Sequence, residues 1–168
     1  MREQAHPMSD NPARLEPGLL PIFKALTKTP TIQTAFEQVG TTQKPLNGQR
    51  ANVRGRATNL GRIAADSTLW YARQAFPDLG VDVALKNGGG IRASIEGPKV
   101  TRFTIQSALA FDNKTAVVEL TGDELLAAME NAVSRVPAAD GRFPQIAGIQ
   151  LEYDASQPGV MGETSVTE

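Results

Sequence analysis

The segment Val81-Asp82-Val83-Ala84-Leu85-Lys86-Asn87-Gly88-Gly89-Gly90-Ile91-Arg92 joins a short apolar run to a triplet of glycines. The run 81–85 is rich in β-branched residues and predicts a buried strand. Glycine has no Cβ and adopts positive φ without steric cost, so a tight turn is expected at 88–90. The segment therefore predicts a strand end at which bare backbone lies between the Asn87 amide and the Arg92 guanidinium.

Two helices are predicted on either side of this segment. Apolar residues recur at helical spacing over 59–76, and Pro77 and Gly80 follow as terminators. Thr121 and Glu124 form a capping box that opens the second helix. The inner stripe of the first helix is expected to comprise Leu60, Ile63, Ala64, Ser67, Trp70, Tyr71 and Ala75. The inner face of the second is expected to comprise Leu125, Met129, Ala132, Val133 and Val136, and Trp70 and Phe143 are assigned to the core.

Other segments predict shorter elements. A short helix is expected over 19–26, and strands are expected over 32–39, 115–120 and 148–153, with a strand or loop over 100–105. Strands and helices without regular alternation favour an α+β domain, with a mixed β-sheet flanked by helices, over a doubly wound sheet.

A dinucleotide-binding turn is the alternative interpretation of the glycine triplet. Gly88, Gly90 and Ala93 formally match the fingerprint, and Asp112 lies about twenty residues further on, where a ribose-binding acid is expected. A Rossmann turn opens directly into a helix, whereas Gly97-Pro98 leaves no room for one. The context therefore argues against this interpretation.

Composition limits the classes of function. The chain has 168 residues, of which 40% are hydrophobic and 21% charged, as in a globular domain. Seventeen basic and eighteen acidic residues give a net charge of −1, which provides no broad basic field for nucleic acid. No apolar run approaches the roughly 18 residues of a membrane span. Cysteine is absent from the sequence, and its first residues lack the apolar region of a signal peptide.

The first 45 residues differ in composition from the rest. Repeated prolines interrupt short apolar patches there, and we interpret residues 1–45 as an interdomain linker or N-terminal extension. Residues 46–168 are then the domain. Its last residues, 162–168, have the composition of a loop, so the domain is expected to be incomplete at its C-terminal end.

The residue types around the glycine triplet suit a small anion. Exposed glycine amides approach a ligand closely, Asn87 offers a donor and an acceptor, and Arg92 can pair bidentately with phosphate or carboxylate oxygens. The same chemistry recurs in the arginines Arg50, Arg54 and Arg56. Each arginine alone is also typical of a solvated surface charge, so the residues by themselves indicate an anion site and no particular anion.

Five ordered motifs resemble the C-terminal domain of the 5′-nucleotidase family. They are Arg54-Gly55-Arg56-Ala57-Thr58-Asn59-Leu60-Gly61, the run Asn87 to Arg92, Phe111-Asp112-Asn113, Leu120-Thr121-Gly122-Asp123-Glu124-Leu125, and Gly141-Arg142-Phe143-Pro144-Gln145. The resemblance covers roughly 45–154 and is nearest to bacterial periplasmic UDP-sugar hydrolases. It implies a 5′-nucleotidase-like α+β fold and a periplasmic or secreted protein.

The resemblance also implies a division of labour. An N-terminal metallophosphatase domain, missing here, would hold two divalent metal ions, and this domain would bind the nucleoside and present the phosphoester. No cofactor is expected in this chain, whose only histidine is His6, so the chain alone is expected to be inactive. The substrate-binding residues implied by the motifs are Arg50, Arg54, Asn87, Gly89, Gly90, Arg92, Phe111, Asn113 and Gly141.

Three alternatives remain at this stage. The parent could act on a cyclic nucleotide as a 2′,3′-cyclic-nucleotide phosphodiesterase, or on a thiosulfate ester. The chain could also be a nucleotide-binding module without catalysis. In the leading interpretation, Phe111 forms one wall of a base-stacking clamp whose second aromatic would lie beyond Glu168.

Overall fold

The computed structural model describes residues 21–22, 25, 28–154 and 156. The chain divides into two compact units, Met1–Glu37 and Gln38–Glu168. The first unit contains helix α2 (Pro30–Ala35), which has a proline in its first turn. Proline is tolerated there because the amide it lacks would have no partner within the helix. The elements described below belong to the second unit.

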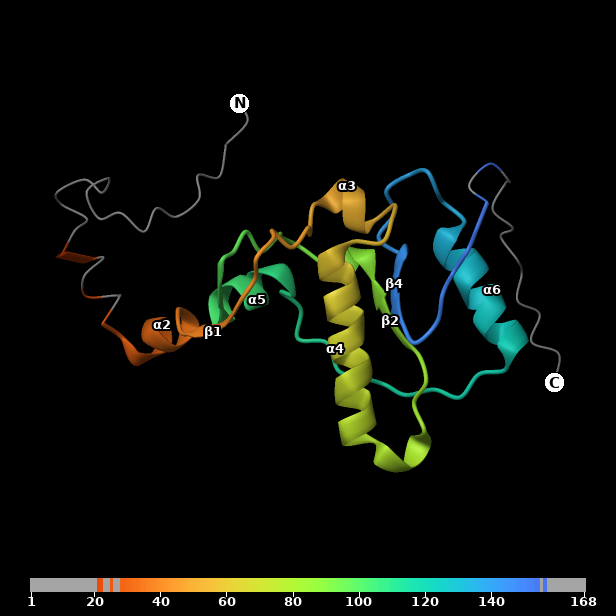
Figure 1. The fold of residues 1–168 in the computed structure, drawn as a ribbon, viewed down its shortest axis with the longest axis horizontal. Coiled ribbons are helices and arrows are strands. Elements are labelled where there is room, and N and C mark those ends of the chain that lie inside the picture. The colour runs from red at the N-terminus through yellow and green to blue at the C-terminus, as the bar shows by residue number, and fades with distance from the viewer. Residues whose placement is uncertain (1–20, 23–24, 26–27, 155, 157–168) are drawn as a thin grey trace. The chain divides into compact units, whose positions relative to one another are not determined.

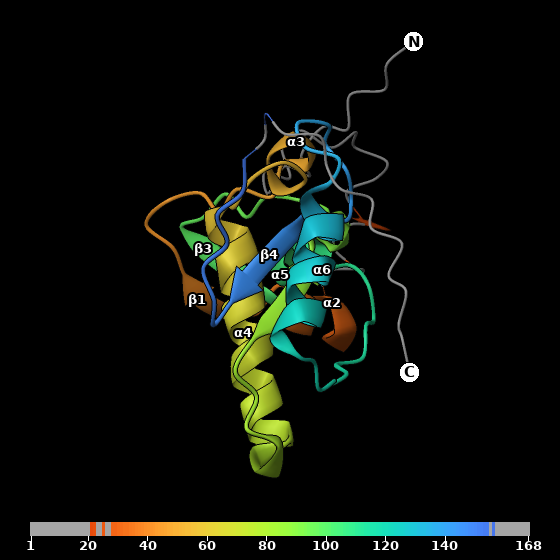
Figure 2. The ribbon, with the colours of Figure 1, turned by 90° about the vertical axis from the view of Figure 1, so that its right-hand side faces the viewer.

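The centre of the second unit is a small sheet between two helices (Figures 1 and 2). Strands β2 (Ala84–Asn87) and β4 (Pro144–Ala147) pair antiparallel, with Ala84 opposite Ala147. Helix α4 (Asn59–Ala75) packs against both strands, and helix α6 (Gly122–Val133) contacts β4. The pairing brings Asn87 opposite Pro144, so the glycine triplet and the chain preceding β4 lie at the same end of the sheet.

A second antiparallel pair forms beside short helices. Strand β1 (Gln38–Thr41) pairs with β3 (Lys99–Thr101), and β3 leads directly into helix α5 (Arg102–Ala108). Helix α3 (Arg50–Val53) precedes α4, and single 3₁₀ turns form at η2 (Pro77–Leu79) and η3 (Gly88–Gly90). The α+β class is confirmed, and in the described part of the chain its strands form two separate two-stranded sheets.

Small side chains allow α4 to lie close to the sheet. One buried cluster contains Ala65, Leu69, Ala84 and Ala147, and the other contains Val53, Leu60, Ala64, Ile91, Ile95 and Ala108. A Cβ at Gly61 would overlap the Gln145 side chain of β4. Glycine at that position therefore permits the close helix-to-strand contact.

Both long helices predicted from sequence are present, but of the stripe predicted to be the inner face of α4 only Leu60 and Ala64 are buried. The buried residues of α4 are Leu60, Gly61, Ala64, Ala65, Leu69 and Ala72. This face is turned by roughly 100°, the angle between successive helix residues, from the predicted stripe. Ile63 and Tyr71 are exposed, and Trp70, which we assigned to the core, is 66% exposed. The prediction placed the large apolar residues on the inner face. In the structure the inner face carries mainly glycine and alanine, because small side chains let the helix pack closely on the sheet.

The other core and cap predictions hold better. Phe143 is buried in the core, and Met129 is the buried residue of α6. The capping box of Thr121 and Glu124 is confirmed, with hydrogen bonds in both directions. Leu125, Ala132, Val133 and Val136 are half-buried, so the predicted inner face of this helix is the face that packs.

Several strand predictions were wrong. The range 32–39 contains the end of α2 and only the start of β1. The range 115–120 has no strand partner in the described part of the chain, and a strand without a partner is not stable. The predicted strand 148–153 is irregular because Gly148 has a φ of 86° and its backbone contacts the Asp82 carbonyl. Beyond β3, the range 100–105 is helical from Arg102, opened by a capping box of Thr101 and Thr104.

The strand predicted at 81–85 is present but displaced to 84–87. The expected helix at 19–26 lies mostly outside the described residues. None of the helices among the described residues has both the length and the apolar character that a membrane crossing requires.

Candidate functional site

Arg54 occupies the junction between two helices. It is the residue that ends α3, and α4 begins five positions later at Asn59. The Arg54 side chain is half-buried, and its Nε is enclosed without a hydrogen-bond partner in the described structure. An enclosed donor without a partner is costly, which makes this guanidinium a candidate for an external acceptor.

The charges around Arg54 are mainly positive. Burial lowers the pKa of the Arg54 guanidinium, the charges of Arg50 and Arg92 lower it further, and the Asp140 carboxylate raises it. Arginine nevertheless keeps its proton in proteins. The Arg54 guanidinium therefore lies within the positive field of two other arginines, and a bound anion would offset that field.

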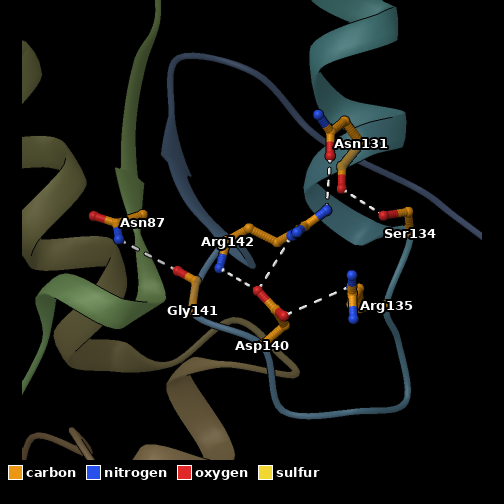
Figure 3. Close-up of polar contacts among 7 residues, drawn as sticks. All are labelled: Asn87, Asn131, Ser134, Arg135, Asp140, Gly141 and Arg142. Carbon is orange, nitrogen blue, oxygen red and sulfur yellow. Dashed lines mark hydrogen bonds and ion pairs between the residues drawn. The ribbon is translucent and has the colours of Figure 1, made fainter. Parts of the chain in front are cut away.

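The glycine triplet is held against the loop that precedes β4. Gly88 N donates to Phe143 O at 2.7 Å, and Gly89 N donates to Gly141 O at 2.8 Å. Asn87 Nδ2 also donates to Gly141 O, at 3.3 Å (Figure 3). A Cβ on Gly141 would lie 3.8 Å from Arg54 Cζ, so the bare backbone of Gly141 lies beside the guanidinium. These contacts connect Asn87, Gly89, Gly141 and Arg54.

Arg92 connects the glycine triplet to an exposed aromatic ring. Its Nη1 donates to Gly89 O at 3.3 Å, and its Cζ lies 5.6 Å from the centroid of the Phe111 ring. The Arg92 backbone N donates to Ala108 O at the end of α5, which places Phe111 close by. The Phe111 ring is still 54% exposed. The Arg92 guanidinium lies over one face of the Phe111 ring. A planar aromatic group of a ligand can therefore stack on the opposite face of this ring.

A polar network holds the loop that carries Gly141 (Figure 3). Asp140 Oδ1 accepts from Arg142 N at 3.0 Å and from Arg142 Nε at 3.2 Å. Arg142 Nη1 donates to Asn131 Oδ1 on α6 at 3.0 Å, and Asp140 Oδ2 lies 3.9 Å from Arg135 Nε. The hydrogen bond from the Arg142 amide holds the pKa of Asp140 below its usual value despite partial burial, and the charges of Arg142 and Arg135 lower it further. The loop is thereby fixed to α6.

Most of the residues proposed from sequence come together. Arg54, Asn87, Gly89, Arg92, Phe111 and Gly141 are linked by the contacts above, Gly90 is buried within η3, and Arg50 acts on Arg54 through its charge. Asn113 lies exposed two residues beyond Phe111, and in the described part of the chain no hydrogen bond joins it to the others. The turn leads into irregular chain, with α5 the next helix, as expected for a turn that is not of Rossmann type.

Sequence reasoning missed three residues that shape the site. Asp140 and Arg142 hold the Gly141 loop, and Gln145 is 1% exposed and bonded to the segment around Arg54. The signal for Gln145 was a lone polar residue among apolar ones in the motif 143–147. The signal for Asp140 was weaker, because a carboxylate beside a glycine is common in exposed turns.

Residues 38–167 match the family model described as 5′-nucleotidase, C-terminal domain. The chain belongs to this family. A crystal structure of a 5′-nucleotidase precursor from Thermus thermophilus has the same fold, with a TM-score of 0.74 and 36% identity over 86% of this chain. The family membership and the α+β fold expected from the motifs are both confirmed.

Two curated relatives are similar over comparable lengths of this chain. The trifunctional nucleotide phosphoesterase protein YfkN of Bacillus subtilis is 40% identical over 73% of this chain, and a 5′-nucleotidase of Vibrio vulnificus is 34% identical over 68%. The matched stretch amounts to 8% and 19% of those proteins, and to 28% of the Thermus chain. The domain therefore corresponds to a small part of these longer proteins.

The described residues do not fit the two metal ions that the resemblance implies for another domain. Among them, no group of three or more histidine, cysteine, aspartate or glutamate side chains could hold an ion. The Asp140 carboxylate, which lies near the site, is engaged by arginines.

Proposed function

We propose that this domain binds a mononucleotide and orients its phosphoester within a larger phosphoric ester hydrolase of the 5′-nucleotidase type. The observation that carries the proposal is the enclosed, unpartnered Nε of Arg54 within a group of three arginines, next to the exposed ring of Phe111. The arginines supply charge for a phosphate, and the ring supplies a stacking face for a base. A mononucleotide contains both groups.

Within this proposal, each site residue has a defined role. Arg50, Arg54 and Arg92 contact phosphate or ribose oxygens, and Phe111 stacks on the base. Asn87, Gly89 and Gly141 form the polar surface between them, Gly90 supports that surface from within η3, and Asn113 lies near the base. Holding the ester in one orientation lowers the entropic cost of the reaction. Attack on phosphorus belongs to a metallophosphatase domain with two divalent ions, which is the macromolecular partner in this proposal.

The proposal extends to nucleotide catabolism outside the cytoplasm, with UDP-sugar hydrolysis as one activity of the whole protein. Support for these finer statements is the motif resemblance, in which Arg50 and Arg54 form the phosphate-contacting pair. The linker at 1–45 and the binding domain at 46–168 also belong to the proposal. A cyclic-nucleotide phosphodiesterase is retained as a second candidate, because one relative is named as a trifunctional nucleotide phosphoesterase.

The test is calorimetric titration of the chain with AMP, adenosine, inorganic phosphate and a 2′,3′-cyclic nucleotide. Arg92→Ala is expected to weaken AMP binding by about tenfold or more, since a charge-assisted hydrogen bond is lost. Phe111→Ala is expected to weaken AMP and adenosine alike, since stacking contributes about 1–3 kcal/mol per base. Preference for the cyclic nucleotide over AMP would favour the second candidate.

Matched control variants lie at the far end of α4. Arg73→Gln removes an exposed arginine and Trp70→Ala an exposed aromatic, and neither residue belongs to the site. Both controls are expected to bind AMP as the unmodified chain does. If the folded chain bound none of the ligands, or if the controls weakened binding as much as the site variants, the proposed function would be wrong.

A further inference from the structure

Gln145 is a buried polar side chain that lies against the start of α4. It lies on β4 and is 1% exposed. Both ends of its amide are used: Nε2 donates to Val53 O at 3.0 Å and to Arg56 O at 2.8 Å, and Oε1 accepts from Thr58 N at 3.2 Å. A buried amide is retained without penalty only when it is satisfied in this way.

All three partners of Gln145 belong to one short segment, 53–58. This segment is the connection from α3 to α4, and Arg54 lies between the two carbonyl groups that Gln145 Nε2 binds. These carbonyls project toward β4 at the point where α3 ends and regular backbone pairing stops. The side-chain amide of Gln145 thus donates to two carbonyl groups, one on either side of Arg54, in place of backbone amides.

The surroundings leave little freedom for this connection to move. A Cβ on Gly88 would overlap Val53 O, and a Cβ on Gly61 would overlap Gln145 Oε1. The segment is therefore enclosed by η3 on one side and by the Gln145 amide on the other. Glutamate has the same reach but no amide donors, and methionine has the reach but neither donor nor acceptor of comparable strength.

We propose that Gln145 is a positioning residue for Arg54. Its amide fixes the 53–58 backbone, and the fixed backbone holds the Arg54 guanidinium beside Arg50 and Arg92. The inference rests on the proposed function, because its first test assumes that the site binds a phosphate-bearing ligand such as AMP more tightly than a phosphate-free one such as adenosine. Gln145 touches no ligand itself. Its effect is confined to the phosphate end, because Phe111 is positioned separately through Arg92 and α5.

The first experiment compares AMP and adenosine affinities of the full chain and of Gln145→Met by calorimetry. We expect Gln145→Met to weaken AMP binding by about tenfold while changing adenosine binding less than about twofold. Leu69→Ala is the matched control, because Leu69 belongs to the other buried cluster and its loss lowers stability without touching 53–58. The control should lower the melting temperature and keep the ratio of the two affinities. An unchanged ratio in folded Gln145→Met would overturn the inference.

The second experiment needs no ligand and separates this inference from the proposed function. Hydrogen exchange of the Arg54 Nε–H, followed by ¹⁵N NMR, should be slow in the unmodified chain and faster by about tenfold or more in Gln145→Met. The Nε–H of Arg142, bonded to Asp140, is the internal reference and should not change. If Gln145→Met does not fold, Gln145→Glu serves as the second variant, since it keeps the side-chain length. Equal Arg54 exchange in variant and parent would overturn the inference whether or not AMP binds.

Discussion

At the scale of single residues, the site depends on places where one backbone touches another. Gly88 is such a place, because its amide bonds to Phe143 O while its Cα faces Val53 O. The three glycines were predicted to form a tight turn whose amides are free to approach a ligand. The turn is present as a 3₁₀ turn without positive φ, but the amides of Gly88 and Gly89 bond to Phe143 O and Gly141 O. The absent side chains therefore serve the close approach of backbone to backbone.

Gly88→Ala is expected to destabilise the fold by about 1–3 kcal/mol, the usual cost of forcing an extra methyl group into a packed interior. The physical cause is overlap of the new Cβ with Val53 O. The measurement is the midpoint of urea unfolding. Gly122→Ala is the control, because nothing lies within 4 Å of a Cβ there, and it should not lower the midpoint. Equal midpoints for Gly88→Ala and the parent would contradict the packing described here.

Asp140 predicts how stability depends on acidity. Its pKa is lower in the folded state, mainly through the hydrogen bond from the Arg142 amide, whereas an unfolded aspartate titrates near about 3.9. The stabilisation is therefore fully present above about pH 4 and is lost as pH falls through the lower folded value. Melting temperatures measured between neutral and strongly acid pH should fall less steeply in Asp140→Asn than in the parent. Parallel curves would show that the Asp140 contacts do not form in solution.

At the scale of elements, local capping signals were predicted correctly from sequence. The capping box of Thr121 and Glu124 involves residues three apart, so the chain itself brings its partners together. The strands depend on partners from distant parts of the chain, and the ranges 115–120 and 148–153 looked like strands without having such a partner. The missed helix α5 also begins with a local box, Thr101 and Thr104, in which threonine replaces the more familiar glutamate.

The start of α4 provides the test of a cap. Thr58 is buried and its hydroxyl accepts from Gly61 N at 3.0 Å. Thr58→Ala should lower the free energy of unfolding by about 1 kcal/mol, within the usual range of about 0.5–2 for an N-cap. Thr58→Ser keeps the hydroxyl and should retain most of the stability. Equal losses in both variants, measured by urea unfolding, would mean that the methyl group and not the cap is responsible.

The orientation of α4 can be tested with its tryptophan, which is the only one in the chain. Trp70 is 66% exposed, although its hydrophobicity assigned it to the core from sequence. Its fluorescence should be quenched by acrylamide in the folded chain almost as efficiently as in urea. Strong protection from the quencher would mean that another surface covers this face of α4. Helical spacing alone could not choose between the two faces, because both carry apolar residues.

At the scale of the whole molecule, the chemical types of the site were predictable and their connections were not. Arg54, Arg92, Phe111 and the glycine triplet stand out because their chemistry is unusual for a turn or a core. Gln145 and Asp140 act by holding other residues, and the segments they join are far apart in sequence. Only the fold reveals that β4 supports the connection between α3 and α4. The hydrogen bonds between Gln145 and residues 53–58 therefore could not be predicted from local sequence.

The last prediction concerns catalysis by the chain itself. We expect no nucleotide hydrolysis, because a di-metal hydrolase needs several histidine and carboxylate ligands. The described residues contain no group of three such side chains, and His6, the only histidine of the sequence, lies outside them. The measurement is phosphate release from AMP by highly purified protein supplemented with Mg²⁺, Mn²⁺ or Zn²⁺, beside a full-length 5′-nucleotidase as positive control.

A rate equal to that of buffer with metal, from protein that still binds AMP, would fit a division of labour between binding here and chemistry elsewhere. Phosphate release above this background has two sources, a contaminating phosphatase or the site itself. The Arg92→Ala variant distinguishes them. A contaminant would be unaffected by that substitution, whereas hydrolysis at this site would fall with the loss of Arg92. Release that depends on Arg92 would contradict the prediction and would require metal ligands within this chain.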